Sequence, residues 1–161
     1  MTGPFRLLRW CLLAFAAAMI PAAAQACTLC SCTASTTALS FGSYSPVTAS
    51  PTDASASVSI NCTGLVSLFG LVEIRASAGT SGTALQRTME HNGSTLRYNL
   101  FANSARTEVL ADGTGGTTTI TTPLNGLLFF STVAPVYARV PASQWVASGT
   151  YGDTVIITVQ Y

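Results

Sequence analysis

The pattern of apolar and polar residues along this chain is that of short β-strands. Near the C-terminus Asp153, Val155, Ile157, Val159 and Tyr161 fall on one face of an extended chain, and the residues between them fall on the other. Alternation with a period of two, rich in β-branched residues, predicts a half-buried strand. This strand reaches the last residue of the sequence. Because a core-facing strand needs neighbours on both edges, the partner of this strand bears directly on function.

The rest of the chain predicts further short strands. They cover about residues 33–44, 54–60, 71–76, 87–89, 96–101, 117–121, 127–132, 136–140 and 149–161. Turn-forming residues separate them every ten to fifteen residues or so, as in all-β sandwiches. Asn92-Gly93 and Asn125-Gly126 each predict a tight hairpin turn between their flanking strands. With no 3.6-residue periodicity of any length, the pattern predicts an all-β, two-sheet Greek-key sandwich in one domain.

Residues 1–26 are predicted to be a cleaved secretory signal peptide. Arg6 and Arg9 supply a positive start, residues 7–20 are almost wholly apolar, and Ala24-x-Ala26 fits a signal-peptidase site. The apolar run is too short and wrongly flanked for a membrane anchor, and no other run approaches the length of a membrane span. We therefore expect an exported protein whose mature domain covers residues 27–161.

Composition narrows the classes of partner. Cleavage after Ala26 leaves 135 of the 161 residues, with five arginines, six acidic residues and no lysine. This is enough for one domain with a core. A nearly neutral surface without basic clusters argues against nucleic acid or an anionic membrane as partner.

Four cysteines remain after removal of the signal, at positions 27, 30, 32 and 62. An even number in an oxidising compartment predicts disulfides, and three pairings are open. A four-thiolate zinc site is less favoured, because such a site usually has a second C-x-x-C motif and Cys62 is not part of one. Lipidation of Cys27 is another alternative. A lipobox, however, has a large aliphatic residue three positions earlier, where this chain has Ala24.

No arrangement of residues favours catalysis, and no cofactor motif is present. His91 is the only histidine and lies beside a predicted turn, where a solvated side chain is usual. Glu73 and Arg75 are in phase on one strand and are interpreted as a solvent-facing pair. The glycine-rich loop at 112–116 lacks the lysine of a phosphate-binding loop. We expect a structural or binding module, without a metal site, rather than an enzyme.

Several short motifs stand in a definite order along the chain. They are C-x6-L-x-F-G-x-Y at 32–44, N-C-T at 61–63, R-x-M at 87–89, L-x-Y-N-L-F at 96–101, Y-x-R-x-P at 137–141 and G-T-Y-x-D-T-V at 149–155. In this order they resemble the spore coat protein U domain, the subunit domain of archaic chaperone–usher pili. The resemblance covers essentially the whole chain after residue 26.

The resemblance implies an incomplete immunoglobulin-like Greek-key sandwich that lacks its closing strand. A periplasmic pilus chaperone would lend a strand during export, and a neighbouring pilus subunit would replace it in the fibre, with an outer-membrane usher as the third partner. The protein would pass through the periplasm to the cell surface, a pilus or the extracellular space.

The resemblance also implies particular site residues. Cys32 and Cys62 would form the family disulfide, which leaves Cys27 and Cys30 to pair with each other. The C-terminal strand would form one wall of the partner-strand groove, through its inward-facing residues Val155, Ile157, Val159 and Tyr161.

One departure from the family suggests a special role. Family pilins usually carry a donor segment of a dozen or so residues before the first cysteine of the motif. Here only residues 27–31 lie between the predicted cleavage site and Cys32. At about 3.3 Å per residue, this stretch is too short to fill a groove. We therefore expect a subunit that accepts a strand and does not donate one.

Two alternatives remain open. The chain could be a self-contained surface or matrix protein, closed internally by a strand between residues 117 and 132. It could also be a carbohydrate-binding sandwich that uses Trp145. A lone tryptophan in a loop is, however, expected to pack onto its own domain.

Overall fold

The structure is a computed structural model in which residues 27–66, 70–124 and 128–161 are described. The predicted signal peptide, residues 1–26, lies outside the described residues. So do the predicted turn residues 125–126 and the side chains of Cys27 and Cys30. Within the described ranges, no helix has the length and apolar character needed to cross a membrane.

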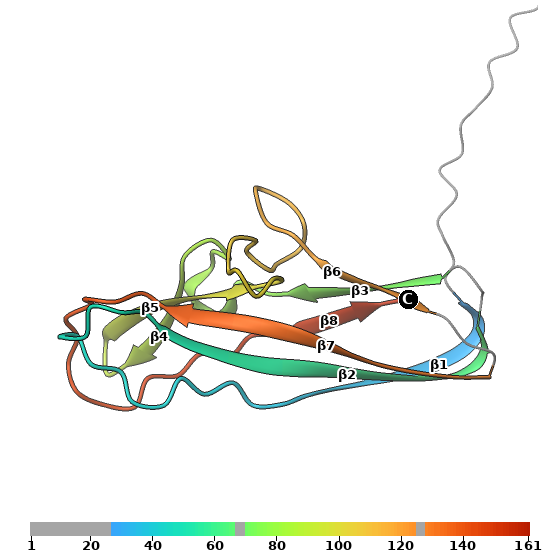
Figure 1. Ribbon diagram of the computed structural model, residues 1–161, viewed down its shortest axis with the longest axis horizontal. Coiled ribbons are helices and arrows are strands. Elements are labelled where there is room, and N and C mark those ends of the chain that lie inside the picture. Colours follow the sequence, from blue (N-terminus) through green and yellow to red (C-terminus); the bar gives the residue numbers. More distant parts are fainter. Residues whose placement is uncertain (1–26, 67–69, 125–127) are drawn as a thin grey trace, which may run out of the picture.

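Two antiparallel sheets make up the described part of the chain (Figure 1). The larger sheet has the strand order β1-β2-β7-β5-β4, and the smaller one has the order β6-β3-β8. The elements are β1 Cys27–Thr36, β2 Thr52–Val66, β3 Gly70–Ala76, the short 3-10 helix η1 Gly79–Ser81, β4 Arg87–His91, β5 Ser94–Phe101, β6 Ile120–Leu124, β7 Leu128–Val140 and β8 Ile157–Gln160.

The strand order is that of an immunoglobulin-like sandwich with one edge position empty. In a complete domain one sheet holds strands A, B, E and D, and the other holds C, F and G. Here β1, β2, β7 and β5 follow the first order, and β3 and β8 occupy the C and F positions. Among the described residues no strand pairs with the far edge of β8, where strand G would lie. The expected fold class, an incomplete immunoglobulin-like sandwich, is therefore confirmed.

The core lies between the two sheets because alternate residues of each long strand face inward. On β2, Val58 and Ile60 are buried while the serines between them face solvent. Val72 and Ile74 of β3 approach them from the smaller sheet and are fully buried. Each such side chain contributes about 1.5–3 kcal/mol through removal of apolar surface from water. The remaining buried apolar residues are Cys62, Ala76, Met89, Leu96, Tyr98, Leu100, Leu110, Ala111, Ala134, Val136, Ala138 and Val140.

The β4–β5 hairpin is confirmed at the predicted turn. Asn92 and Gly93 have φ values of 45° and 81°, and a type I′ turn requires positive φ at both central residues. The flanking strands pair from Arg87 opposite Tyr98 to His91 opposite Ser94.

The strand predicted over residues 33–44 is wrong beyond Thr36. The first strand instead occupies Cys27–Thr36, and the N–H of Thr37 donates the last hydrogen bond to β2, at 3.0 Å to Ser57 O. Gly42 has φ 67°, a left-handed conformation that a strand does not contain. The following residues therefore run along the sandwich without a strand partner among the described residues.

The hairpin predicted around residues 125–126 is also wrong, because its flanking strands belong to different sheets. β6 pairs with β3, whereas β7 pairs with β2. β7 also joins the strands predicted at 127–132 and 136–140 into one that runs through Pro135. Since β5 pairs with β7 only over residues 137–139, β7 has a partner on one side at Pro135, where a missing N–H is tolerated.

The C-terminal strand is shorter than the predicted range 149–161. β8 covers only Ile157–Gln160 and pairs with residues 73–76 of β3. Before it, Gly152 forms an isolated bridge with Glu90. The stretch from 153 to 156 has the alternating burial of a strand, but its only backbone–backbone hydrogen bond among the described residues is from Ser77 N to Ile156 O, so it forms no regular ladder.

Candidate functional site: an open groove along the last strand

Two adjoining cavities open into the core between the segment after β1 and the segment before β8. The first, of about 390 Å³, lies between residues 36–41 and 151–157. The second, of about 650 Å³, lies between residues 39–46 and 146–151. Leu39, Phe41, Met89 and Tyr151 line both cavities, so the two form one continuous depression, which we name the edge groove.

One wall of the edge groove has unused backbone groups. Within the described part of the chain, the backbone N–H and C=O groups of Ala38, Leu39 and Phe41 form no hydrogen bond. The side chains of Leu39 and Phe41 nevertheless turn inward and pack half-buried against the core, whereas that of Ala38 is exposed. Unpaired backbone beside an apolar hollow is a template for β-pairing.

The opposite wall is held along one edge only. The backbones of Gly152 and Glu90 exchange two hydrogen bonds, at 2.9 and 3.2 Å, and Ile156 O accepts from the N–H of Ser77 at 2.9 Å. Hydrogen-bonding direction alternates along an antiparallel strand, so residues two apart share an edge. The backbone groups of Val155, Ile157 and Val159 therefore point away from β3, toward the free edge.

The four residues predicted to form the groove wall are only partly brought together. Val155 and Ile157 line the first cavity. Val159 is half-buried and packs on the core, but it lines neither cavity. Tyr161 is 48% exposed and also lies outside both.

The floor of the groove consists of residues to which the sequence pattern assigned no site role. Met89, Tyr98, Leu100 and Val136 line the first cavity, from β4, β5 and β7. Three of these four lie within the motifs R-x-M and L-x-Y-N-L-F. The motifs marked them as special, but only the packing of the two sheets places them under one groove.

A buried arginine lies behind the groove. Arg87 is fully buried, and its guanidinium donates to the carbonyls of Ser77 (3.0 and 2.7 Å), Ala84 (3.1 Å) and Leu110 (2.9 Å) and to Asn99 Oδ1 (2.8 Å). These bonds use its full set of donors. Burial lowers the pKa of Arg87, and the nearby Tyr98 and Asp153 oppose that shift. The side chain ties the loop after β3 to β4 and β5.

Asp153 accepts hydrogen bonds beside this arginine and lines the first cavity. The Tyr98 hydroxyl donates to its Oδ2 at 2.6 Å, and the N–H and hydroxyl of Thr80 donate to its Oδ1 at 2.9 and 2.8 Å. Burial raises the pKa of Asp153, but the hydrogen bonds from Tyr98, Thr80 and Thr154 outweigh it, so the pKa lies below its ordinary value.

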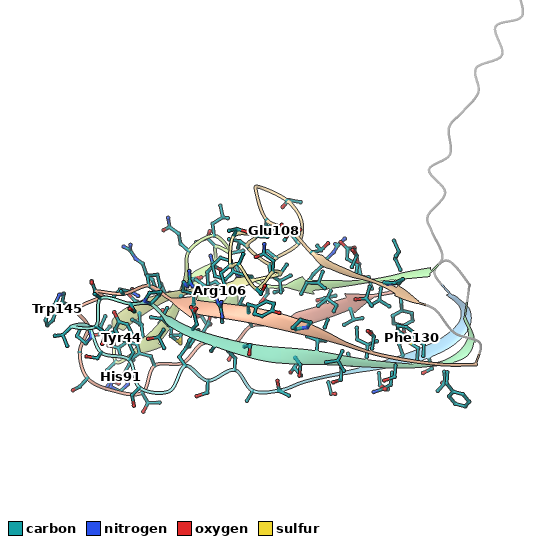
Figure 2. All side chains as sticks on the ribbon, in the orientation of Figure 1. Tyr44, His91, Arg106, Glu108, Phe130 and Trp145 are labelled. Carbon is teal, nitrogen blue, oxygen red and sulfur yellow. A yellow bond between two sulfur atoms is a disulfide. The ribbon has the colours of Figure 1, made fainter. Side chains whose placement is uncertain are left out.

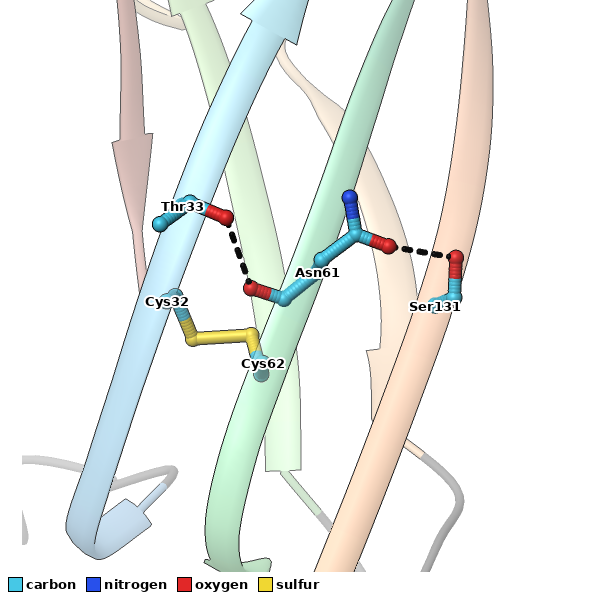
Figure 3. Close-up of a disulfide and its surroundings, with 5 residues drawn as sticks. All are labelled: Cys32, Thr33, Asn61, Cys62 and Ser131. Carbon is cyan, nitrogen blue, oxygen red and sulfur yellow. Dashed lines mark hydrogen bonds between the residues drawn. A yellow bond between two sulfur atoms is a disulfide. The ribbon is translucent and has the colours of Figure 1, made fainter.

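The disulfide between Cys32 and Cys62 joins β1 to β2 (Figure 3). The two residues are directly opposite in the strand register, with Cα atoms 4.0 Å apart. Nearby, Thr33 Oγ1 donates to Asn61 O at 3.4 Å and Ser131 Oγ lies 2.8 Å from Asn61 Oδ1. This pairing confirms the one implied by the family resemblance. Pairing of Cys27 with Cys30 stays a prediction.

Trp145 lies in a loop at the end of the sandwich opposite the C-terminus (Figures 1 and 2). Its side chain is 77% exposed, so the expectation that it packs onto its own domain is wrong. The preceding Gln144 fixes this loop, because its side chain bonds both backbone groups of Arg97, at 2.9 and 3.0 Å. Gln144 N also donates to the Tyr44 hydroxyl at 2.7 Å. The loop is therefore anchored while the indole faces solvent.

Three other predicted features have clear positions. His91 is half-buried, with its ring centroid 5.5 Å from that of Tyr151, rather than solvated as expected. Arg75 Nη2 lies 2.8 Å from Glu73 Oε2 in a partly exposed pair, as expected. Asp112 accepts from Thr114 and Thr117 within its own loop.

Comparisons with known proteins agree with this architecture. The family model described as Spore Coat Protein U domain matches residues 16–158. No curated protein sequence matches the chain. Among solved structures, a similar one is the chaperone–tip adhesion subunit pre-assembly complex CsuC–CsuE from archaic chaperone–usher Csu pili of Acinetobacter baumannii. It has 21% sequence identity and a TM-score of 0.51. The match covers 83% of this chain and 40% of that chain, and at this identity it shows a shared fold.

Proposed function

This chain belongs to the Spore Coat Protein U domain family, and we propose that it is a structural subunit of a chaperone–usher-type pilus or surface coat. In this proposal the protein is exported, and a strand from a periplasmic chaperone and then from a neighbouring subunit fills the edge groove. The outer-membrane usher would handle the chaperone-bound form. The edge groove carries the proposal, because it combines an apolar hollow with unpaired backbone on both walls.

The position of β6 favours this proposal over a sandwich closed from within. The self-contained alternative needs a strand between residues 117 and 132 beside the free edge of β8. β6 does lie in that range, but it pairs with β3 on the side away from β8. β7, which begins at residue 128, pairs with β2 in the other sheet. Neither of these described strands therefore closes the groove.

The pairing of β1 supports the further proposal that this subunit accepts a strand without donating one. After the predicted cleavage site the chain enters β1 at once, and β1 pairs with β2 from Cys27 opposite Val66 to Thr36 opposite Val58. Residues in a sheet of their own domain are not free to enter a groove elsewhere. A subunit of this kind suits the tip of a fibre or a capping position.

Binding of a donor peptide tests the open groove. The probe is a synthetic peptide with the N-terminal extension of a pilus subunit encoded beside this chain, added to purified residues 27–161. At a hundredfold excess over Kd we expect the melting temperature to rise by about 10 °C. Scanning calorimetry measures the shift, and co-purification with the neighbouring chaperone provides a second readout.

Two adjacent substitutions give a matched control. Val155→Arg places a charge in the first cavity and should abolish the shift, because Val155 lines that cavity. Ile156→Arg changes a side chain that is 66% exposed on the opposite face, and it should keep the shift. A stable wild-type monomer with no response to any such peptide would overturn the proposal.

The exposed Trp145 favours carbohydrate binding as a second candidate function. An aromatic ring facing solvent on an anchored loop offers an apolar platform of the kind on which sugar rings stack. If the loop is a glycan site, binding on a glycan array should be lost in Trp145→Ala. The melting temperature should change little, since the indole is mostly exposed. Equal binding by both proteins, or binding by neither, removes this candidate.

A further inference from the structure

Three residues of the sequence motifs lie together beside and behind the edge groove. Arg87 comes from R-x-M, Tyr98 from L-x-Y-N-L-F and Asp153 from G-T-Y-x-D-T-V. Tyr98 and Asp153 are 55 residues apart in the sequence, yet the hydroxyl and carboxylate are in direct contact at 2.6 Å. Their meeting point lies directly beside the groove wall that would receive a strand.

The wall has two anchors from this cluster. Asp153 is bonded to β5 through Tyr98 and to η1 through Thr80. Ile156 is bonded to Ser77, whose carbonyl in turn accepts from Arg87. Between these anchors, Val155 makes no backbone hydrogen bond among the described residues.

The Asp153 carboxylate packs so closely against η1 that no side chain fits at Gly79. Gly79 has φ 70°, and a side chain at this position would overlap the Asp153 carboxylate. The N–H of Thr154 also donates to Oδ1, at 2.7 Å, so the carboxylate fixes the chain direction at its own position as well. Three donors from β5 and η1, together with the N–H of Thr154 in the same stretch, thus hold the Asp153 carboxylate.

We propose that Asp153 is the positioning residue of the groove: its carboxylate holds residues 152–156 extended, with their free edge exposed, before a donor strand arrives. The inference rests on the proposed function and adds how the backbone of the acceptor edge is held extended before a donor strand binds. A preformed edge spares an incoming strand the cost of ordering its partner, and only the ordered fraction of molecules binds productively. Losing the carboxylate should therefore slow association more than it speeds dissociation.

Because the Asp153 carboxylate is charged, its ordering of residues 152–156 should depend on pH. The titratable groups that face it are Tyr98 from β5 and Arg87 from β4. Burial raises the pKa of Tyr98, so it stays a neutral donor, and Arg87 stays charged. Because the pKa of Asp153 is below its ordinary value, its stabilising contribution is present above about pH 4 and is lost as the pH falls further.

The test compares Asp153→Asn with Asp112→Asn. Asp112 is a matched control, since it too accepts hydrogen bonds from threonines and has a lowered pKa, but in a loop away from the groove. With the donor peptide described above, surface plasmon resonance should show about tenfold slower association for Asp153→Asn and a smaller change in dissociation. Asp112→Asn should match the wild type. Below about pH 4 association should slow for the wild type and Asp112→Asn, and Asp153→Asn should lack this change.

A second measurement needs no peptide. In the free protein, the amide hydrogens of Thr154 and Ile156 should exchange faster in Asp153→Asn, and in Tyr98→Phe, which removes one donor and keeps the carboxylate. Unchanged exchange and unchanged association in these variants would overturn the inference. If no peptide binds the wild type, the proposed function fails, and the exchange result still decides whether Asp153 orders the edge.

Discussion

Replacing Arg87 with methionine should lower the free energy of unfolding by about 4 kcal/mol, the largest effect we expect from one substitution. Methionine fills a similar space but donates no hydrogen bond. The carbonyls of Ser77, Ala84 and Leu110 would then lose their donor in or near the core, and the amide oxygen of Asn99 would keep only the bond from Leu100 N. Replacing both members of a buried ion pair by apolar residues is often neutral, because no unpaired polar group remains. In Arg87→Met only the donor is removed, and the carbonyl acceptors remain in or near the core without it.

Urea unfolding followed by circular dichroism measures this effect. Arg97→Met serves as the control, because Arg97 is exposed and its hydrogen bonds to other described residues use only its backbone. It should change stability by less than about 0.5 kcal/mol. A loss below about 1 kcal/mol for Arg87→Met would contradict the role assigned to the buried hydrogen bonds.

Removing the disulfide in Cys32→Ala/Cys62→Ala should cost about 3.5 kcal/mol. The bond closes a loop between residues 30 apart in the sequence, which restricts the unfolded chain. It also joins β1, an edge strand, to β2, so its loss should be felt first as fraying of β1.

Thermal unfolding and hydrogen exchange separate the two consequences. The double variant should melt at lower temperature, and the amides of β1 should lose more protection than those of β7, which has neighbours on both sides. Cys27→Ala/Cys30→Ala is the control, since it leaves the bond between β1 and β2 intact. Equal stability of the two double variants would contradict this account.

Much of the fold could be predicted because the signals are local. Alternation over residues 54–60 predicted a strand that the structure confirms within β2, and Asn92-Gly93 predicted a turn that the structure also confirms. The turn type and the alternation of side chains depend on a few neighbouring residues, so both can be predicted from a single sequence.

Errors arose where strand pairing decided the outcome. Residues 38–44 carry an apolar pattern suited to a strand, but none of the described strands pairs with them, and Gly42 takes a left-handed conformation. The two strands flanking residues 125–126 also belong to different sheets, because each pairs with a different partner strand. Alternation tells which face of a segment is buried, and it does not tell which segment lies beside it.

The candidate site was predictable in part. The family resemblance implied that Val155, Ile157 and Tyr161 line the groove. Val155 and Ile157 line the first cavity, whereas Tyr161 follows the same alternation and lies outside both cavities. Leu39 and Met89 were not predicted there, since they reach the groove from other parts of the chain.

The residue pattern was enough to predict an all-β domain whose last strand has one face suited to a core. That this strand lies at the edge of its sheet became clear only from the packing of the described strands. Edge or centre is a property of the whole sheet: β3 borders β8 on one side, and β6 lies on the far side of β3. The same holds for Asp153, whose partners come from η1 and β5. Burial follows from a residue's own chemistry, but pairing depends on long-range packing that no short stretch of sequence encodes.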